Sequence, residues 1–392
     1  MQSRFDKMTD RRDSGSMKWD VKENELPMWV ADMDFETAPE IIESFIQRIN
    51  HGIFGYTLIE EEWYRAYQDW WGERHDFEIQ KEWLIFCTGV VPAISSIVRK
   101  MTTIGENIVV LTPVYNIFFN SILNNGRHAV ESKLFYREGV YEINWDDLEE
   151  KLSNPQTTML LLCNPHNPIG KIWDRHTLAK IGELCDKYHV LVVADEIHCD
   201  ITQTGKEYIP FASVSEKCRD NSITCIAPTK AFNLAGIQTA AVIVPNEWIR
   251  NKVNRGLNTD EVAEPNILAA IAPIVAFEKG GSWLDELRVY LWNNRKYAEE
   301  YIVNEISDIS VVHAEATYLL WIDCRKIAGD SSELCRFLRE KTGLYVSDGR
   351  EYRNGDGFLR MNLACPLERV VDGMVRLKKG ILEYEAWICE TC

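Results

Sequence analysis

The stretch SITCIAPTKAFNLAG, residues 222–236, joins a strand-like apolar run to a lysine in apolar surroundings. The apolar run covers residues 223–227 and stops at Pro228, and Lys230 follows on the turn. Apolar neighbours would desolvate the ammonium group of this lysine and lower its pKa. Such a lysine is a candidate for forming a Schiff base. The alternative is a lysine whose stem covers apolar surface while its charged end reaches water.

Residues 223–227 belong to a series of six apolar runs of strand length. Near-continuous hydrophobicity is typical of strands covered on both faces, as in a mainly parallel sheet. Between two of the runs, residues 177–189 place their apolar side chains on one face of a helix. This alternation predicts a doubly wound α/β domain. The six runs are WLIFC (83–87), NIVVL (107–111), TMLLLC (158–163), VLVVA (190–194), ITCIA (223–227) and TAAVIV (239–244).

The two ends of the chain show a different pattern. SSELCRFLREKTG, residues 331–343, predicts a helix that ends at Gly343, and ATYLLWID, residues 316–323, predicts a short strand. We therefore expect two domains. The large one is the mainly parallel sheet domain over residues 46–288, and the smaller α+β domain is built from residues 1–45 and 289–392.

Composition and charge narrow the class of protein. The chain has 392 residues, of which 46% are hydrophobic and 26% charged, as is ordinary for a soluble globular enzyme. The net charge of −17 argues against nucleic acid or an anionic membrane surface as a partner. No apolar run approaches the roughly 20 residues of a membrane span. The first 20 residues contain no apolar segment that could serve as a signal peptide.

The 11 cysteines are scattered, and most lie within apolar runs. This usage is typical of free thiols in a reducing compartment, so we expect a cytoplasmic protein without a disulfide framework. The one close pair, Cys389 and Cys392, has no second pair of ligands beside it in the sequence. We therefore predict no metal site.

Polar and aromatic residues follow several predicted strands, at the edge where α/β sheets bind ligands. TGVVPAISS begins with a turn into a helix, where the N–H groups of Gly89, Val90 and Val91 could hold a phosphate. A plain strand–helix turn is the alternative. In TPVY, Tyr115 could lay its ring over a flat ligand.

The next two predicted strands end in an amide and a carboxylate. In NPHNPIG, the Asn-Pro pairs predict a rigid turn that orients the amide of Asn167. Asp195 directly follows VLVVA, and a carboxylate buried there needs a cationic partner such as a protonated heterocyclic nitrogen. His198 could reach the same ligand, or it could be a core histidine that bonds to the backbone.

An amine, a buried carboxylate, an oriented amide, an aromatic ring and an anion pocket together match what pyridoxal phosphate requires. Neither GxGxxG nor GxxxxGK[ST] occurs in the chain, so the sequence indicates neither a dinucleotide site nor a P-loop.

The order of motifs along the chain resembles fold-type I pyridoxal-phosphate enzymes, and specifically the MalY/PatB family of C–S β-lyases. The resemblance covers nearly the whole chain, and the motifs are specific in combination. They are MWVADMDFETAPEI (28–41), HGIFGYT (51–57), TGVVPAI (88–94), TPVY (112–115), NPHNPIG (164–170), ADEIH (194–198), PTKAFNLAG (228–236) and FLRMNLACP (358–366).

The resemblance implies a role for each residue at the strand ends. Lys230 binds the cofactor covalently and shuttles the Cα proton of the substrate, and Asp195 pairs with the pyridine nitrogen. Asn167 hydrogen-bonds the phenolic oxygen and takes part in substrate binding, while Tyr115 stacks on the ring. His198 stands where many aminotransferases have a tyrosine.

The resemblance also implies a substrate site shared between two chains. Arg360, in FLRMN, binds the α-carboxylate of the substrate, for which its planar fork is suited. Tyr56, in FGYT, reaches across a homodimer interface to the cofactor and substrate of the other subunit.

Two positions depart from the wider aminotransferase pattern. Gln238 stands where an arginine commonly binds the phosphate, and Ala227 stands where a serine is frequent. The resemblance therefore leaves the phosphate to residues 89–91, Thr229 and Tyr56 of the partner subunit.

The activity implied by the resemblance is β-elimination from L-cystathionine or related S-substituted cysteines, which yields pyruvate, ammonia and a thiol. The alternative among enzymes is an aminotransferase of the same fold, which would need a keto acid for turnover. A regulatory, protein-binding role is a more remote alternative, since some members of the family act on transcriptional regulators.

Overall fold

The computed structural model describes residues 3–391, and its largest element is a seven-stranded sheet of order β2–β10–β9–β8–β7–β3–β4. The strands from β9 to β4 are parallel, and β10 runs antiparallel to both of its neighbours. The strands are β2 (Leu84–Cys87), β3 (Asn107–Thr112), β4 (His128–Lys133), β7 (Thr157–Cys163), β8 (Leu191–Asp195), β9 (Ser222–Ile226) and β10 (Ala240–Ile243).

Each of the six predicted apolar runs forms one strand of this sheet, so the predicted α/β fold with a mainly parallel sheet is confirmed. Strand β4 is not among the predicted strands. Its sequence, HAVESK, is largely polar because β4 lies at the edge of the sheet, and all of its residues except Ser132 are exposed or only partly buried. An edge strand has less apolar cover and leaves no continuous hydrophobic run.

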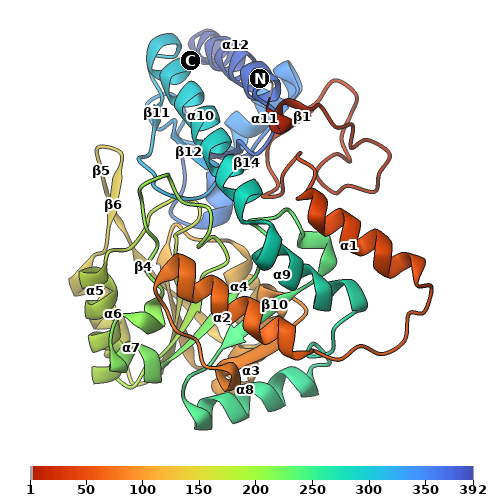
Figure 1. The fold of residues 1–392 in the computed structure, drawn as a ribbon. Coiled ribbons are helices and arrows are strands. Elements are labelled where there is room, and N and C mark those ends of the chain that lie inside the picture. Colours follow the sequence, from red (N-terminus) through yellow and green to blue (C-terminus); the bar gives the residue numbers. More distant parts are fainter. Residues whose placement is uncertain (1–2, 392) are drawn as a thin grey trace.

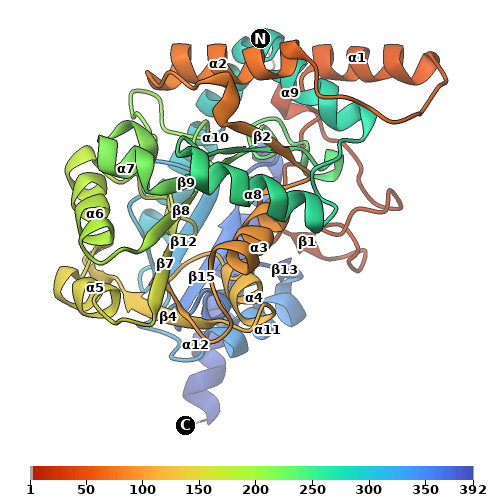
Figure 2. The same ribbon diagram turned by 90° about the horizontal axis from the view of Figure 1, so that it is seen from below.

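Helices cover both faces of the large sheet (Figure 2). The helix predicted within residues 177–189 is α6, and its residues Leu178, Ile181 and Cys185 are fully buried, as their spacing predicts. The helices α3 (Val90–Met101), α4 (Ile117–Leu123) and α8 (Glu247–Thr259) pack together on one face, and α5 (Trp145–Leu152), α6 (Arg175–Lys187) and α7 (Glu216–Asp220) pack on the other.

A smaller four-stranded sheet, of order β11–β12–β15–β14, lies with α10, α11 and α12 at one end of the molecule (Figure 1). The strand predicted within residues 316–323 is β12, and the helix predicted within residues 331–343 is α11. This helix ends as predicted at Gly343, whose backbone is left-handed, with φ 72°. The elements are β11 (Ser310–Val311), β12 (Leu319–Asp323), β14 (Ser347–Asp348), β15 (Phe358–Asn362), α10 (Gly281–Glu305), α11 (Ser331–Thr342) and α12 (Leu367–Thr391).

The remaining elements connect distant parts of the chain. Strand β1 pairs in parallel with β13, so residues near the start of the chain pack against the C-terminal part. Helix α9 packs against α1 and α2, and β5 and β6 form a separate hairpin. These elements are β1 (Leu26–Pro27), β13 (Leu344–Tyr345), α1 (Pro39–Asn50), α2 (Glu61–His75), α9 (Ile267–Lys279), β5 (Phe135–Arg137) and β6 (Val140–Glu142).

Both predicted domain boundaries fall inside helices. The boundary at 45/46 lies within α1 and the boundary at 288/289 lies within α10, so the division into two domains stays a prediction. Among residues 3–391, no single helix is long and apolar enough to cross a membrane, and α9 and α10 reach that criterion only when joined across a bend of 78°.

Candidate active site

The carboxyl ends of the central parallel strands open into a cavity of about 270 Å³. Strand pairing places Cys163, Asp195 and Cys225 side by side on β7, β8 and β9, so the ends of these strands share one edge of the sheet. Nine of the predicted site residues line the cavity. They are Gly89, Val90, Val91, Tyr115, Asn167, Asp195, His198, Thr229 and Lys230.

Lys230 lies on the turn after β9, where it faces the cavity. Its Nζ donates to the carbonyl oxygen of Ala31 at 2.6 Å. Burial, reinforced by the positive charge of Arg360, lowers the pKa of the Lys230 amine to about 8. Near neutral pH a larger fraction of this amine is therefore neutral and nucleophilic than of an exposed lysine.

The Asp195 carboxylate is buried at the end of β8, with 4% of the residue exposed. Its Oδ1 accepts one hydrogen bond, from the backbone N–H of Ile197 at 3.2 Å. Burial raises the pKa of Asp195 to about 6. The positive charge of Lys230 offsets this rise only in part, and no ion pair at 4 Å or less joins a cation within residues 3–391 to the carboxylate. A cationic group bound in the cavity would therefore stabilise its charged form.

Arg360 does not line the cavity itself but lies beside it, on β15 of the smaller sheet. Its Nη1 donates to Asn167 Oδ1 at 3.4 Å, and its Nη2 donates to the carbonyl oxygen of Trp29 at 2.7 Å. The Nε atom is buried and has no hydrogen-bond partner among the described residues. The ring of Tyr352 lies 4.9 Å from the guanidinium carbon. A buried guanidinium with neutral neighbours and an unused N–H is suited to binding an anionic ligand.

The N-terminus of α3 forms another wall of the cavity. Gly89 caps this helix with extended backbone, and no side chain caps its N–H groups. Thr229 and Gln238 line the cavity as well. The free N–H groups and the positive end of the helix dipole favour an anion at this position.

Tyr115 and His198 contribute uncharged side chains to the cavity. Burial, with a smaller effect of Asp195, raises the pKa of Tyr115 to about 12. Burial and the positive charge of Lys230 lower the pKa of His198 to about 3. The histidine is therefore neutral at physiological pH, and its Nδ1 has no partner among the described residues.

Tyr56 does not reach the cavity of its own chain. It lies on the connection between α1 and α2, outside the cavity lining, with its side chain fully exposed. Ile53, Phe54 and Leu58 on the same connection are also more than 60% exposed.

A second feature near the site is the segment of residues 29–35, which we call the bridging segment. Ala31, within it, lines the cavity and accepts the hydrogen bond of Lys230. This segment is part of the motif MWVADMDFETAPEI. The side-chain pattern of the motif does not indicate its contact with Lys230, because the acceptor is a backbone carbonyl. Thr88, Cys163, Ile197 and Thr239 also line the cavity without having been predicted.

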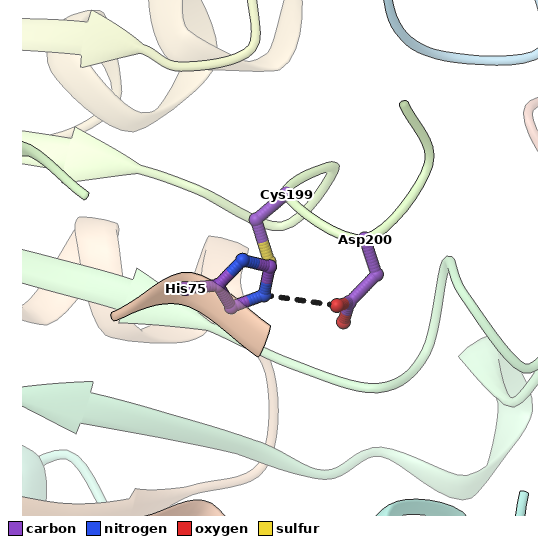
Figure 3. Close-up of side chains that lie close together, drawn as sticks. All are labelled: His75, Cys199 and Asp200. Carbon is purple, nitrogen blue, oxygen red and sulfur yellow. Dashed lines mark hydrogen bonds and ion pairs between the residues drawn. The ribbon is translucent and has the colours of Figure 1, made fainter. Parts of the chain in front are cut away.

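Outside the cavity, His75 at the end of α2 lies close to Cys199 and Asp200, which follow β8 in the sequence (Figure 3). Asp200 Oδ1 accepts hydrogen bonds from His75 Nε2 and Trp70 Nε1, each at 3.0 Å. The three residues of this cluster line a cavity together with Arg74 and Arg288, both of which form ion pairs with Asp285. The hydrogen bonds account for the cluster as a link between α2 and the segment after β8. Cys392, which forms the close pair with Cys389 in the sequence, lies outside the described residues.

Three comparisons with known proteins identify the family. Residues 24–376 match the family model described as aminotransferase class I and II, so the chain belongs to the aminotransferase class I and II family. The chain is 40% identical to cystathionine β-lyase PatB of Bacillus subtilis, over 96% of this chain and 99% of that protein. It is 31% identical to protein MalY of Escherichia coli, over 96% and 98%. Within the wider family, it belongs to the MalY/PatB group.

The fold comparison agrees with the sequence comparison. The crystal structure of cystalysin from Treponema denticola, described as containing a pyridoxal 5′-phosphate cofactor, aligns with a TM-score of 0.94. The two sequences are 31% identical, and the alignment covers 98% of this chain and all of that one.

Proposed function

We propose that this protein is a pyridoxal-phosphate-dependent C–S β-lyase that acts on L-cystathionine or related S-substituted cysteines. The observation that carries the proposal is the arrangement of Lys230, Asp195 and Arg360 around one cavity. The 40% identity with a cystathionine β-lyase over nearly the whole chain supports the same reaction.

The residues around the cavity fit pyridoxal phosphate. Asp195 is a buried carboxylate without a cationic partner, and a protonated pyridine nitrogen would supply one. The uncapped N-terminus of α3 and Thr229 suit the phosphate, and Lys230 is placed for covalent attachment. When bound, pyridoxal phosphate withdraws electrons from the Cα of an amino acid.

Each side chain then has a defined task. Arg360 binds the substrate α-carboxylate, with Asn167 beside it. Asn167 would also donate to the phenolic oxygen of the bound cofactor, and Tyr115 would cover the face of its ring. Asp195 would keep the ring nitrogen of the bound cofactor protonated. His198, neutral and unpaired at Nδ1, contributes a polar but uncharged wall.

Lys230 moves the proton that the reaction requires. Its neutral amine accepts the proton from Cα of the substrate, the electron pair of that bond forms the Cα–Cβ double bond, and the Cβ–S bond breaks. The sulfur leaves as a thiolate and takes up a proton. Hydrolysis of the remaining amino-acrylate yields pyruvate and ammonia.

The alternative is transamination, the activity for which the wider family is named. The two are separated by incubating the purified holoenzyme with L-cystathionine in the absence of any keto acid. A β-lyase releases pyruvate and thiol continuously. An aminotransferase stops after one turnover per site, and that result would overturn the proposal. This experiment does not test the more remote alternative, a regulatory role through protein binding.

We also propose that the protein is a homodimer with shared active sites. The exposed apolar connection around Tyr56 supports this, because a solvated position is unfavourable for four large side chains so close together. The cavity also lacks an arginine for the phosphate, since Gln238 lines it at that position. The Tyr56 hydroxyl of the partner subunit would supply a missing donor.

A cytoplasmic location stays part of the proposal. The ten cysteines within the described residues are all free, which supports a reducing compartment. Fractionation of cells that express the protein, followed by detection with an antibody, tests this location.

A further inference from the structure

The bridging segment, residues 29–35, is held in two ways. The carboxylates of Asp32 and Asp34 form ion pairs with Arg11, Lys18 and Arg369, and the backbone carbonyl groups accept hydrogen bonds from side chains. Six of these oxygens accept hydrogen bonds from side chains of the lysine turn or of β15, in addition to bonds from Arg11, Lys18, Tyr318 and Ser347. The bonds run from Arg360 Nη2 to Trp29 O (2.7 Å), from Asn362 Nδ2 to Val30 O and Asp32 O (2.6 Å each), from Lys230 Nζ to Ala31 O (2.6 Å), and from Asn233 Nδ2 to Met33 O (3.1 Å) and Phe35 O (2.8 Å).

Asn233 ties this segment to the turn that carries Lys230. It lies three residues after the lysine and has a left-handed backbone, with φ 55°, which asparagine tolerates better than most residues. Besides its two donor bonds, its Oδ1 accepts the N–H of Met33 at 3.0 Å. Three hydrogen bonds of the Asn233 amide, two donated and one accepted, therefore join the bridging segment to the turn that carries Lys230.

Asn362 ties the other side of the segment to the smaller sheet. It is buried on β15, two residues after Arg360 and thus on the same face of that strand. Its two acceptors, the carbonyls of Val30 and Asp32, stand on either side of Ala31. The hydroxyl of Tyr318 also donates to the Ala31 carbonyl, at 3.0 Å. The position of the Ala31 carbonyl oxygen is therefore restricted by the bonds of Asn362 to the residues on either side and by the direct bond from Tyr318.

We propose that Asn233 is a positioning residue for Lys230. By holding the bridging segment, it keeps the Ala31 carbonyl where it can accept a hydrogen bond from the lysine amine whenever that amine is not covalently bound. A free lysine side chain samples many rotamers, and a fixed acceptor restricts it to the one that faces the cavity. The inference rests on the proposed role of Lys230 toward pyridoxal phosphate.

The test measures covalent capture and non-covalent binding separately. Apoprotein is mixed with pyridoxal phosphate, and the rate of covalent attachment is followed by borohydride trapping and mass spectrometry. Pyridoxine phosphate has an alcohol in place of the aldehyde, so its dissociation constant reports the pocket without the lysine. The variant Asn233→Gly removes the amide but retains the left-handed backbone without strain.

If Asn233 positions Lys230, capture by Asn233→Gly slows by about ten- to a hundredfold, as expected for a misplaced reacting group. The dissociation constant for pyridoxine phosphate then stays within about twofold of wild type, since the phosphate and ring contacts are unchanged. An unchanged capture rate overturns the inference. Equal losses in capture and in pyridoxine phosphate binding also overturn it, because they indicate general damage to the pocket.

A second variant keeps the test valid if Asn233→Gly does not fold. Asn233→Asp keeps the shape and the bond from the Met33 N–H but loses both donor bonds, and the same outcomes apply to it. Asn221→Gly is the matched control, since the Asn221 amide donates to Val190 O just before the start of β8, away from the cavity. It should capture the cofactor at the wild-type rate. A wild-type protein that captures the cofactor but releases no pyruvate would refute the proposed lyase activity and leave this inference intact.

Discussion

Burial affects the titratable residues of the cavity in opposite directions. It lowers the pKa of Lys230 to about 8 and raises that of Asp195 to about 6, because it disfavours the charged form of each. The two groups therefore both tend toward neutrality in the cavity. For Lys230 this creates a nucleophile, and for Asp195 it creates a site that favours a cationic ligand.

The pKa of Lys230 predicts the pH dependence of covalent cofactor attachment to apoprotein. Below about pH 8 the amine is mostly protonated, so the rate should rise about tenfold per pH unit and then level off near pH 8. For an ordinary lysine, the rate would continue to rise to about pH 10. Stopped-flow absorbance measures the rate. Lys230→Ala, as control, should show no covalent product after borohydride reduction, and a reducible product in this variant would contradict the assignment.

The pKa of Asp195 predicts opposite effects of Asp195→Asn on stability and on activity. The raised pKa means that the folded apoprotein binds a proton more tightly than the unfolded chain, so stability falls as pH rises from about 4 to about 6. The variant lacks this loss, and its apoprotein should be more stable than wild type at pH 7 by on the order of 2 kcal/mol. At pH 3.5 the difference should disappear. Urea unfolding at both pH values measures it.

The same variant should lose nearly all turnover as a holoenzyme. Loss of an electrostatic partner in a buried site raises the barrier by on the order of 3 kcal/mol, or about a hundredfold in rate. Pyruvate release from L-cystathionine measures the effect. Activity within a few-fold of wild type would show that Asp195 does not have this role.

At the scale of elements, the start of the chain is joined to the C-terminal part, and Arg360 contacts the former through the carbonyl oxygen of Trp29. Strand β1 pairs with β13, which follows directly after α11 and Gly343. Gly343 has φ 72°, and a Cβ atom added there would lie 2.4 Å from the carbonyl oxygen of Asn24. This turn therefore requires glycine both for its backbone conformation and for the close approach of the N-terminal segment.

We expect Gly343→Ala to destabilise the protein by more than the conformational strain alone. A left-handed alanine costs about 1–2 kcal/mol, and displacement of the Asn24 backbone should bring the loss to about 3 kcal/mol or more. Gly105→Ala is the matched control, since Gly105 has φ 86° and nothing within 4 Å of the added atom. Urea unfolding compares the two. Equal losses would show that the contact with Asn24 contributes nothing.

At the scale of the whole molecule, the connection between α1 and α2 leaves Tyr56 fully exposed, and Tyr56 does not line the cavity of its own chain. If the active sites are shared, a mixture of Tyr56→Phe and Lys230→Ala chains should recover activity on subunit exchange. Each mixed dimer then contains one site with both substitutions and one site with neither. Tyr56→Phe alone should weaken cofactor retention by about tenfold, since a hydrogen bond to a charged group is worth roughly 1.5–3 kcal/mol.

Analytical ultracentrifugation and activity of the mixture check this arrangement. A protein that sediments as an active monomer would rule out shared sites. Mixed chains that exchange subunits but regain no activity would rule them out as well.

The sequence by itself determined the large sheet and the residues at its carboxyl edge. Six apolar runs marked six strands, and Lys230, Asp195, Asn167 and Tyr115 could be placed because each follows a strand directly. Burial of a strand on both faces demands a continuous apolar run, and parallel strands end at a common edge, so both features are local in the sequence.

Only the tertiary structure decided how the remaining parts meet this edge. It placed Arg360 beside Asn167, brought Ala31 to Lys230 and joined Asn233 and Asn362 through the bridging segment. The polar edge strand β4 and the link between His75 and Asp200 also emerged only there. These contacts join residues from 21 to 332 positions apart, and many of them use backbone carbonyls. Every residue has such a carbonyl, so the identity of the side chains cannot indicate which one will be used.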